Sequence, residues 1–417
     1  MTVLIPTLRR AQRIAPIVAN LRAVSPQVRV VFVVEEQESY DAATKAGAEA
    51  VWNTRAKSYA GAINSGFEQT DGEWVFTGAD DLEWREGWLS ALAPLMKQYS
   101  VMGTNDLHAD HVMRGDDATH MAVKREYINA LGGTASFEPG RVMWEGYEHY
   151  FCDPELVNMA RWRGVWSPCL ESHVAHFPER ENGDEKMDAN LSAREADKAK
   201  YKRRSGVWEQ DPIKCLKHKI PFAYTRWGDG EWNAAMQLRP GKANCDKHLF
   251  YPDMGAELTR IIKGKPDYMI GLQPLARRLL GDKIERFAGS HNWTTSEHFH
   301  NAARRNDWAF LDYIRAMRLA IVGPAHLAKA FPNVLHFVVP DQNCWKVGDE
   351  VMRWCRRKAK GQTCFVFCAS MASNVWIDRL WGEFKGKHLF VDAGSVFDPL
   401  CGVESRKYMK GKANDKD

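Results

Sequence analysis

The stretch 72-GEWVFTGADD-81 joins an apolar run, Trp74-Val75-Phe76, to two neighbouring acids, Asp80 and Asp81. The run has the length of a buried strand, and the glycine after it marks the end of that strand. Upstream, short apolar runs alternate with segments of helical composition. This alternation predicts a mostly parallel sheet with helices on both faces. Ligands bind at the carboxyl ends of such strands, which is where the two acids stand.

The other apolar runs extend this pattern into two series. In the N-terminal part they predict strands at 2–6, 28–34 and 48–53 and helices at 11–23, 39–47 and 59–68. Beyond residue 211 they predict strands at 221–225, 267–272, 318–323, 334–339, 363–368 and 388–394, with helices that include 302–317 and 347–358. Residues 179–204, between the series, are polar, charged and helical in composition.

The length of the chain supports two domains. Single hydrophobic cores stop growing at about 250–300 residues, and this chain has 417. We therefore predict an α/β domain at 1–178, a charged helical connector at 179–210 and a second α/β domain at 211–417.

The composition argues against a membrane protein and favours a cytoplasmic one. Hydrophobic residues make up 45% of the chain and charged residues 26%, as in ordinary soluble proteins. No run approaches the ~18 apolar residues of a membrane span, and the N-terminus lacks the pattern of a secretory signal. The nine cysteines form no disulfide framework, so we expect reduced thiols in a cytoplasm, that of the host if the protein is viral.

The charge is distributed unevenly along the chain. Counting Lys and Arg as positive and Asp and Glu as negative, the net charge is −7 for residues 1–178 and +11 for residues 211–417. A basic domain attracts polyanions such as nucleic acid. A lysine-rich solvated surface is the alternative explanation of the same surplus.

Asp80 and Asp81 suit a metal site at the end of a strand. Carboxylate oxygens are the ligands that Mg²⁺ and Mn²⁺ prefer, and such an ion neutralises the diphosphate of a nucleotide sugar as it leaves. The alternative is a helix cap, in which both side chains bind free backbone N–H groups before 82-LEWREGWLSAL-92.

Residues 1–178 resemble family-2 glycosyltransferases of the GT-A fold. The matching stretches are 3-VLIPTLRR-10, 57-KSYAGAINSGFEQTDGEWVFTGADDLEWREGWL-89, 146-GYEHYFCDPELVNMARWRG-164 and 172-SHVAHFP-178. The resemblance implies a nucleotide-sugar donor, with a UDP-sugar as the first expectation, and a Mn²⁺ or Mg²⁺ ion.

The same resemblance assigns roles to individual residues. It implies that Asp81 binds the metal with Asp80 as its partner, and that His176, or else His173, completes the metal shell. The implied donor site consists of Pro6, Thr7, Arg9, Glu35 or Glu36, Lys57, Tyr59 and Asn64.

Transfer with inversion needs a base for the acceptor hydroxyl. Asp153 and Glu155 stand where the family keeps its catalytic acid, and of the two we predict Asp153 as the base. The alternative is stabilisation of a helix N-terminus, which favours acids without any chemistry. Asp106, after the next predicted strand, is predicted to contact the acceptor.

A second acidic stretch, 225-TRWGDGEW-232, follows a predicted strand in the second domain. The glycine between Asp229 and Glu231 allows a sharp turn that brings both carboxylates to one cation, and a plain strand-to-helix turn is the alternative. Residues 211–410 resemble the GT-D glycosyltransferase domain, whose hallmark is this Arg-aromatic-Gly-Asp-Gly-Glu segment. The resemblance implies a metal at Asp229 and Glu231 and a donor site with Arg226, Trp232, Gly323 and Ser370.

The sequence therefore predicts an enzyme with two glycosyltransferase domains, GT-A followed by GT-D-like. Such domains resemble those of phage-encoded enzymes that glycosylate hydroxymethylated pyrimidines in DNA. The basic second half and the sixteen tryptophans suit a nucleic acid as acceptor. The alternatives are transfer to a surface polysaccharide or a protein, a second domain that only binds nucleic acid or sugar, and nucleotidyl transfer.

Overall fold

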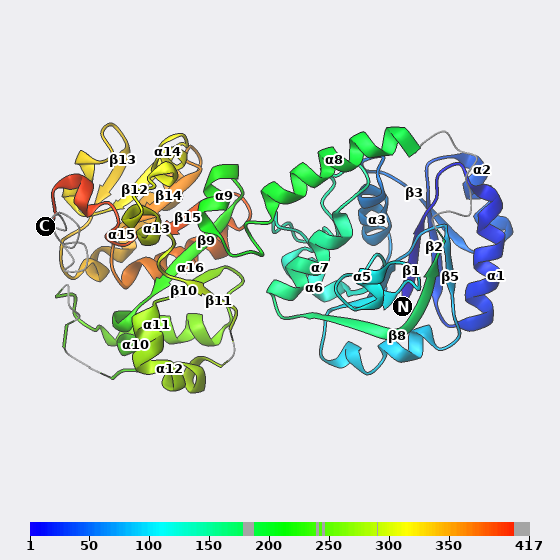
Figure 1. Cartoon of the computed structure of the whole chain (residues 1–417), viewed down its shortest axis with the longest axis horizontal. Helices are drawn as coiled ribbons and strands as arrows, with labels where there is room; N and C mark the ends of the chain where they lie inside the picture. Colours follow the sequence, from blue (N-terminus) through cyan, green and yellow to red (C-terminus); the bar gives the residue numbers. More distant parts are fainter. Residues whose placement is uncertain (178–186, 239–241, 244–246, 290, 404–417) are drawn as a thin grey trace, which may run out of the picture. The chain divides into compact units, whose positions relative to one another are not determined.

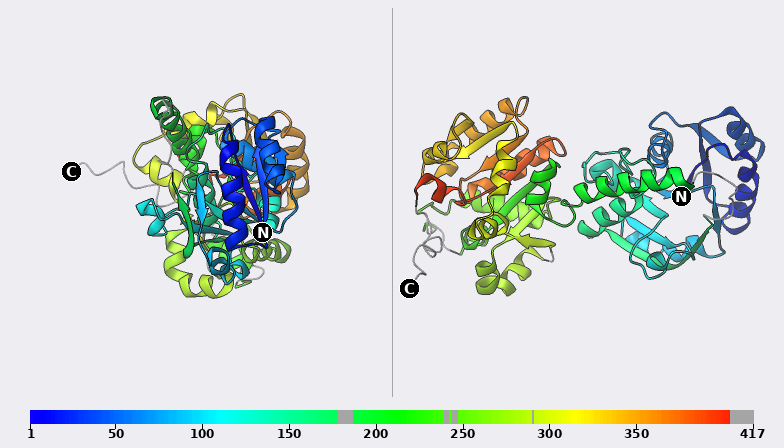
Figure 2. Two further views of the ribbon diagram at one scale, coloured as in Figure 1. Left: turned by 90° about the vertical axis from the view of Figure 1, so that its right-hand side faces the viewer. Right: turned by 45° about the horizontal axis from the view of Figure 1, so that its top comes forward.

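The structure is a computed structural model of the chain and divides it into two compact units, Met1–Trp208 and Glu209–Asp417. It describes residues 1–177, 187–238, 242–243, 247–289 and 291–403 (Figure 1). Each unit is built around one large β-sheet with helices on both faces (Figures 1 and 2). The predicted α/β fold class is confirmed in both units.

The first sheet has the strand order β3-β2-β1-β4-β7-β6-β8-β5. Its parallel half consists of β1 (Thr2–Pro6), β2 (Arg29–Val34), β3 (Glu49–Trp52) and β4 (Trp74–Thr77). Its mixed half consists of β5 (Leu82–Trp84), β6 (Val101–Asn105), β7 (Met121–Lys124) and β8 (Trp166–His176). The predicted alternation of strands and helices matches the parallel half, whose carboxyl ends form one edge.

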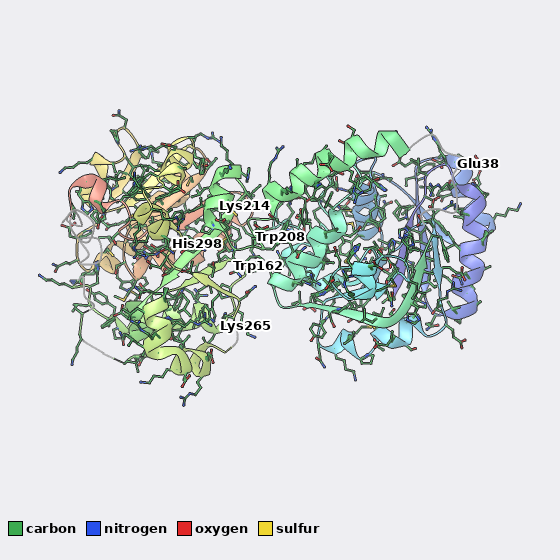
Figure 3. All side chains as sticks on the ribbon, viewed as in Figure 1. Glu38, Trp162, Trp208, Lys214, Lys265 and His298 are labelled. Carbon is green, nitrogen blue, oxygen red and sulfur yellow. The ribbon has the colours of Figure 1, made fainter. Side chains whose placement is uncertain are left out.

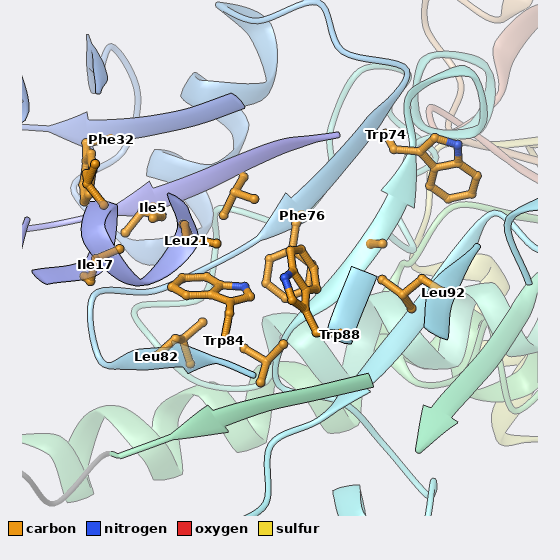
Figure 4. Packing of buried hydrophobic residues seen from close by; sticks show 14 of the residues in the cluster. Ile5, Ile17, Leu21, Phe32, Trp74, Phe76, Leu82, Trp84, Trp88 and Leu92 are labelled. Atoms are coloured by element: carbon orange, nitrogen blue, oxygen red, sulfur yellow. The ribbon is translucent and has the colours of Figure 1, made fainter. Parts of the chain in front are cut away.

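Helices pack on both faces of this sheet because successive strand residues point to opposite sides. Val3 and Ile5 join one core cluster with helix α1, and Leu4 joins a second cluster with helix α3. Figure 4 shows the first cluster, in which Phe76 packs edge-on against Trp88 with ring centroids 5.2 Å apart. The helices are α1 (Ile14–Val24), α2 (Gln37–Lys45), α3 (Tyr59–Glu68), α4 (Trp88–Leu92), α5 (Asp110–Met113), α6 (Arg125–Leu131), α7 (Cys152–Trp162) and α8 (Met187–Arg204), with 3₁₀ turns η1 (Ala11–Arg13) and η2 (Leu95–Lys97).

Helix α8 belongs to the first unit, although its sequence is that of a polar connector. Asp197 and Arg204 are buried. The ring of Tyr201 lies against Phe151 and Trp208, with centroid distances of 5.2 and 5.1 Å (Trp208 is labelled in Figure 3). The stretch predicted as a connector, 179–210, thus contributes a packed helix to the first unit. Its residues 179–186 lie outside the described part of the chain.

The second sheet, over the described residues, has seven parallel strands in the order β11-β10-β9-β15-β14-β12-β13. They are β9 (Phe222–Trp227), β10 (Met269–Leu272), β11 (Trp293–Thr295), β12 (Leu319–Gly323), β13 (Leu335–Val338), β14 (Cys364–Phe367) and β15 (Leu389–Asp392). Strands β10, β12, β14 and β15 are buried along their whole length, as expected for a parallel sheet covered on both faces. All but the short β11 were predicted.

The helices of the second unit include one difference from the prediction. A single helix was predicted at 302–317, but the chain forms two helices separated near Asn306, whose φ of 57° lies in the left-handed region that ends helices. The helices are α9 (Pro212–His218), α10 (Asp229–Ala235), α11 (Pro252–Lys263), α12 (Pro274–Ala288), α13 (His298–Arg304), α14 (Ala309–Arg315), α15 (Gly348–Lys358) and α16 (Ala372–Phe384), with 3₁₀ turns η3 (Ala325–Lys329), η4 (Cys344–Val347) and η5 (Asp398–Cys401). Among the described helices, none has the length and apolarity needed to cross a bilayer.

Candidate functional site

Asp80, which follows β4, is held by the loop that follows β1. Thr7 Oγ1 donates to Oδ2 (2.9 Å), Arg10 Nη1 donates to Oδ1 (2.9 Å), and Arg13 Nη1 donates to the backbone carbonyl of Asp80 (3.2 Å). Burial raises the pKa of Asp80, and the charge of Arg10 and the Thr7 hydrogen bond oppose this rise. Asp80 therefore fixes two loops of the sheet edge to each other.

Asp81 and His176, the two residues predicted to bind the metal, form an acid–imidazole pair. Their Oδ2 and Nε2 atoms lie 3.4 Å apart, because β8 and β5 pair His176 with Leu82. The other carboxylate oxygen, Asp81 Oδ1, is buried and has no hydrogen-bond partner. Burial by itself raises the pKa of Asp81, but the hydrogen bond and charge of His176 and the charge of His120 lower it to about 2. Asp81 is thus an anion with one unpartnered oxygen. The alternative ligand, His173, is exposed.

His120, which the sequence did not single out, lies against this pair. Its ring centroid is 5.2 Å from that of His176, and its Nδ1 is 2.9 Å from the carbonyl oxygen of Thr77. Burial and then the charge of His176 lower the pKa of His120 to about 4. The ring is therefore neutral, Nδ1 donates to Thr77, and the buried Nε2 is an acceptor with no partner.

The donor set at Asp81 and His176 fits a divalent cation. A carboxylate oxygen and an imidazole nitrogen are both ligands that Mn²⁺ accepts, and carboxylate oxygen suits Mg²⁺ as well. Within the described ranges, no three His, Cys, Asp or Glu side chains already converge as a metal cage. A cation in a nucleotide site takes part of its shell from phosphate oxygens and water, so two protein ligands suffice.

Asp153 stands half-buried in the first turn of α7. Burial and then the charge of Asp117 raise its pKa to about 8, and Cys152 and His176 oppose the rise. Burial lowers the pKa of His176, but the hydrogen bond and charge of Asp81, with smaller contributions from Asp106 and Asp153, raise it overall. A carboxyl group with a pKa near working pH suits a general base.

Glu155 points away from this site, into the interior of the first unit. It is 1% exposed, and Arg204 donates to both of its oxygens at 2.6 and 2.7 Å. Tyr147 Oη donates to Oε2 (2.7 Å) and the Ala135 N–H donates to Oε1 (2.8 Å). Every acceptor position of the Glu155 carboxylate is occupied by the protein, so these contacts give it a structural role and favour Asp153 as the base.

Glu155→Gln is expected to destabilise the first unit by about 3–5 kcal/mol, the usual cost of removing one member of a buried ion pair. The guanidinium of Arg204 would remain buried without its counter-charge. Urea unfolding followed by tryptophan fluorescence measures the effect. The matched control is Glu83→Gln, which removes the same charge from an exposed pair with Arg85 and should change stability by less than about 1 kcal/mol. Equal effects of the two variants would contradict the prediction.

Most of the predicted donor residues do lie at the carboxyl edge of the parallel strands. Pro6 ends β1, and Arg9, with a φ of 56°, donates its backbone N–H to the Glu36 carboxylate. Glu35 follows β2 and accepts from Asn53 Nδ2 (2.7 Å). Lys57 is exposed, and Tyr59 Oη donates to the carbonyl of Gly78 (3.2 Å).

The side chains of Asn64 and Asp106 make hydrogen bonds within the protein. Asn64 is fully buried, and its amide makes hydrogen bonds of 2.8–3.1 Å with the backbone of Val142 and Met143 and with Glu145. These contacts give Asn64 a structural role, and its donor contact stays a prediction. Asp106 is 1% exposed and accepts from the backbone N–H groups of His108 and Ala109 (3.0 and 2.9 Å), and its acceptor contact likewise stays a prediction.

In the second unit, Arg226 on β9 contacts β15, the turn that follows β11, and helix α16. Its Nε donates to the Ser296 carbonyl (2.8 Å), and its Nη2 lies 3.7 Å from the Glu297 carboxylate. Its backbone N–H donates to Asp392 Oδ2 (3.3 Å), and its carbonyl accepts from Asn374 Nδ2 (3.0 Å). Asn374 is fully buried, and its Oδ1 has no partner.

The two acids of the second stretch differ in their surroundings. Asp229 is exposed, whereas Glu231 Oε2 accepts from the backbone N–H of Gly228 (2.8 Å). Burial, reinforced by the charges of Asp392 and Asp229, raises the pKa of Glu231 to about 7 against the effect of its backbone hydrogen bonds. Burial also raises the pKa of Asp392 to about 6, although Arg226 opposes it. Glu231 thus stands as the turn alternative describes, with Asp392 as a third acid that the sequence did not single out.

The remaining predicted donor residues of this unit differ in burial and in their position along the sheet. Trp232 is fully buried against Trp227 and Trp293, with ring centroids 5.0 and 5.9 Å away, and its donor contact stays a prediction. Gly323 ends β12, and Ser370 follows β14 with a φ of 51°. Both therefore stand at the carboxyl edge of the sheet.

Gly394→Ala is expected to displace the guanidinium group of Arg226 from its observed position. A Cβ at residue 394 would lie 1.7 Å from Arg226 Nη1, and the φ of 55° adds strain. We expect a loss of stability in the second unit greater than the ~1–2 kcal/mol that a left-handed φ alone costs an alanine. Gly402→Ala is the control, because its φ is 72° and no atom lies within 4 Å of the added Cβ. Chemical denaturation of both variants measures the difference, and equal losses would contradict the steric argument.

Residues 2–143 match glycosyl transferase family 2. The chain carries a glycosyltransferase family 2 domain. By this domain the protein is a glycosyltransferase, and the match covers β1 to β4 with the acids that follow them. No curated protein matches the chain.

Several solved structures are similar at low identity. A domain of unknown function 1792, described as having a distinct glycosyltransferase fold, is 16% identical over 46% of this chain and 80% of its own, with a TM-score of 0.37. Glucosyl-3-phosphoglycerate synthase from Mycobacterium tuberculosis, solved with Mn²⁺, UDP-glucose and phosphoglyceric acid, is 13% identical over 49% and 79%, with a TM-score of 0.35. A mannosyltransferase from Pyrobaculum calidifontis, solved with GDP-Man and Mn²⁺, is 15% identical over 75% and 84%, with a TM-score of 0.35.

Proposed function

We propose that the family-2 domain transfers a sugar from a nucleotide-sugar donor to an acceptor hydroxyl, with Mn²⁺ or Mg²⁺ held by Asp81 and His176. The supporting observation is the Asp81 carboxylate, which is buried and anionic and has one oxygen without a partner. Leaving such an oxygen unpaired costs free energy, which a bound cation recovers. When bound, the cation neutralises the diphosphate leaving group.

The residues around this pair have separate tasks in the proposal. Asp153 accepts the proton of the acceptor hydroxyl while the new bond forms at the anomeric carbon and the nucleoside diphosphate leaves from the opposite face. Thr7 and Asp80 hold the loops after β1 and β4 in place. Lys57 offers its exposed ammonium group to the diphosphate, and Glu35 or Glu36 is assigned to the nucleotide base.

A second donor site is proposed at the carboxyl end of β9, with Asp229 and Glu231 as cation ligands and Ser370 on the neighbouring edge. Its support is the set of buried polar groups around Arg226, including the unpartnered Oδ1 of Asn374. Asn374 Nδ2 donates to the backbone carbonyl of Arg226, so the amide cannot be flipped without placing Oδ1 against that carbonyl oxygen. In the orientation observed, Asn374 Oδ1 is left to accept a hydrogen bond from a ligand hydroxyl. A second unit that only binds sugar or nucleic acid is the competing function.

The proposed acceptor is a 5-hydroxymethylated pyrimidine in DNA, with a surface polysaccharide or a protein as the alternative. The net charge of +11 over residues 211–417 supports a polyanionic acceptor. A primary hydroxyl on a pyrimidine is chemically suited to the transfer because a single general base is enough to remove its proton.

The test is incubation of the full chain with Mn²⁺, a panel of UDP- and GDP-sugars, and either hydroxymethylated DNA, unmodified DNA or no DNA. We expect nucleoside diphosphate release and a mass gain on the hydroxymethylated nucleoside. Donor consumption without that mass gain would reject DNA as the acceptor, and pyrophosphate release would indicate nucleotidyl transfer. No consumption of any donor would reject the transferase proposal for these sugars.

Asp81→Ala and Asp229→Ala, assayed separately, test for two sites. Loss of different sugars from the product supports two donor sites. Loss of the same single sugar in both variants contradicts two reactions, and full activity of Asp229→Ala favours a second unit that only binds.

A further inference from the structure

The loop from Tyr147 to Phe151 leads directly into α7, whose first turn carries Asp153. A shift of this loop would therefore move the first turn of α7, and Asp153 with it.

The backbone of this loop is held by one side chain of another element. Asp197 on α8 is fully buried, and its Oδ2 accepts from the backbone N–H groups of Glu148, His149 and Tyr150 at 2.9–3.0 Å. Its Oδ1 accepts from the Glu148 N–H (3.0 Å) and from Lys200 Nζ (2.9 Å). Three successive N–H groups around one carboxylate form an anion-binding concavity, and these bonds lower the pKa of Asp197 against the effect of burial.

Helix α8 holds α7 at two further points. Tyr201 Oη accepts from Asn158 Nδ2 (2.9 Å), and Arg204 binds the Glu155 carboxylate. Asp197, Tyr201 and Arg204 are spaced by four and three residues, so they lie on one face of the helix. The same face thus fixes the loop, the first turn and the middle of α7.

We propose that Asp197 is a positioning residue for sugar transfer, which fixes residues 148–150 and through them the placement of Asp153 against Asp81 and His176. This inference rests on the proposed function of the family-2 domain. Asp197 need not touch donor or acceptor, because a displacement of about 1 Å at the reacting groups is enough to cost about 100-fold in rate. None of its described contacts reaches the loops after β1 and β2, so nucleotide binding should be spared.

The test compares Asp197→Asn with the wild-type full chain. The asparagine keeps the size of the side chain but places an N–H₂ group against backbone N–H groups. We expect faster hydrogen exchange at residues 148–150 and a fall in kcat for donor turnover of about 10–100-fold. The affinity for UDP or GDP with Mn²⁺, measured by calorimetry, should change by less than about threefold, since only a transition-state contact is weakened. Glu195→Gln, an exposed acid on the same helix, is the control and should match the wild type.

The outcomes separate this inference from the proposed function. Unchanged kcat in Asp197→Asn, or unchanged exchange at residues 148–150, would overturn the positioning role while leaving the transferase intact. A parallel loss of kcat, nucleotide affinity and thermal stability would show general unfolding and would also overturn it. A wild-type chain that neither binds nucleotide nor consumes donor would overturn the proposed function, and the positioning role with it.

Discussion

Asp81→Ala should reduce donor turnover by the family-2 domain by about 1,000-fold or more, because several kcal/mol of leaving-group stabilisation depend on the cation. Asp81 is the acid next to His176 whose second oxygen has no partner. Its neighbour Asp80 is already engaged by Thr7 and Arg10. Removing Asp81 should therefore remove metal affinity, whereas the loops that Asp80 holds should stay in place.

Two measurements check this expectation. Binding of Mn²⁺ without donor, followed by calorimetry, should be lost in Asp81→Ala, and a chelator should reduce wild-type turnover to the level of the variant. Asp71→Ala is the matched control, because Asp71 is an exposed acid shortly before the same strand. Wild-type Mn²⁺ affinity in Asp81→Ala would place the cation elsewhere.

Asp153→Asn should lower kcat by about 100- to 10,000-fold, the range that general base catalysis contributes. The amide keeps the size of the side chain but cannot accept the proton of the acceptor hydroxyl. Donor binding should remain, because the residues assigned to the nucleotide belong to the loops after β1, β2 and β4. Single-turnover assays with the acceptor found by the donor panel separate this effect from binding.

The pH dependence of the wild-type enzyme gives an independent check on Asp153. Burial and Asp117 raise its pKa to about 8, against the effects of Cys152 and His176. A base must be deprotonated, so activity should rise with pH and level off above the pKa of Asp153. A bound cation nearby shifts this midpoint below about 8, because positive charge favours the carboxylate. In Asp153→Asn this rise should disappear.

The control for Asp153 addresses the helix-dipole alternative. Asp349 occupies the first turn of α15, which has 11 residues like α7, and its side chain is exposed. If Asp153 only stabilised a helix N-terminus, Asp153→Asn and Asp349→Asn would both change stability by about 0.3–1 kcal/mol. Neither would then change the rate of the chemical step.

The strands that carry the site were predictable because each has its own local signal. The run Trp74-Val75-Phe76 is apolar, short and followed by glycine, and parallel strands of this kind are buried whatever their neighbours are. The position of Asp81 follows from the same signal, since a residue after a parallel strand must lie at the carboxyl edge. Local signals do not reveal the partners of a side chain, as for Asn64, whose amide binds the backbone of residues 142 and 143.

Asp153 and Glu155 illustrate why residue type alone could not show which acid faces the site. Both are acids in the first turn of α7, but two residues along a helix they point in directions about 200° apart. Arg204, 49 residues further on, decides that Glu155 faces inward. No local pattern in the sequence contains that pairing.

The sequence by itself determined the two α/β units and the strand ends at which Asp81 and Asp229 stand, because hydrophobic periodicity and glycine punctuation act over a few residues. The tertiary structure decided which acids remain available. It occupied Asp80 and Glu155 with partners of the protein, left Asp81 Oδ1 without one, and made a polar helix the support of the loop before Asp153. Hydrogen bonds between residues distant in the chain made these choices, and they depend on positions in space that no local stretch specifies.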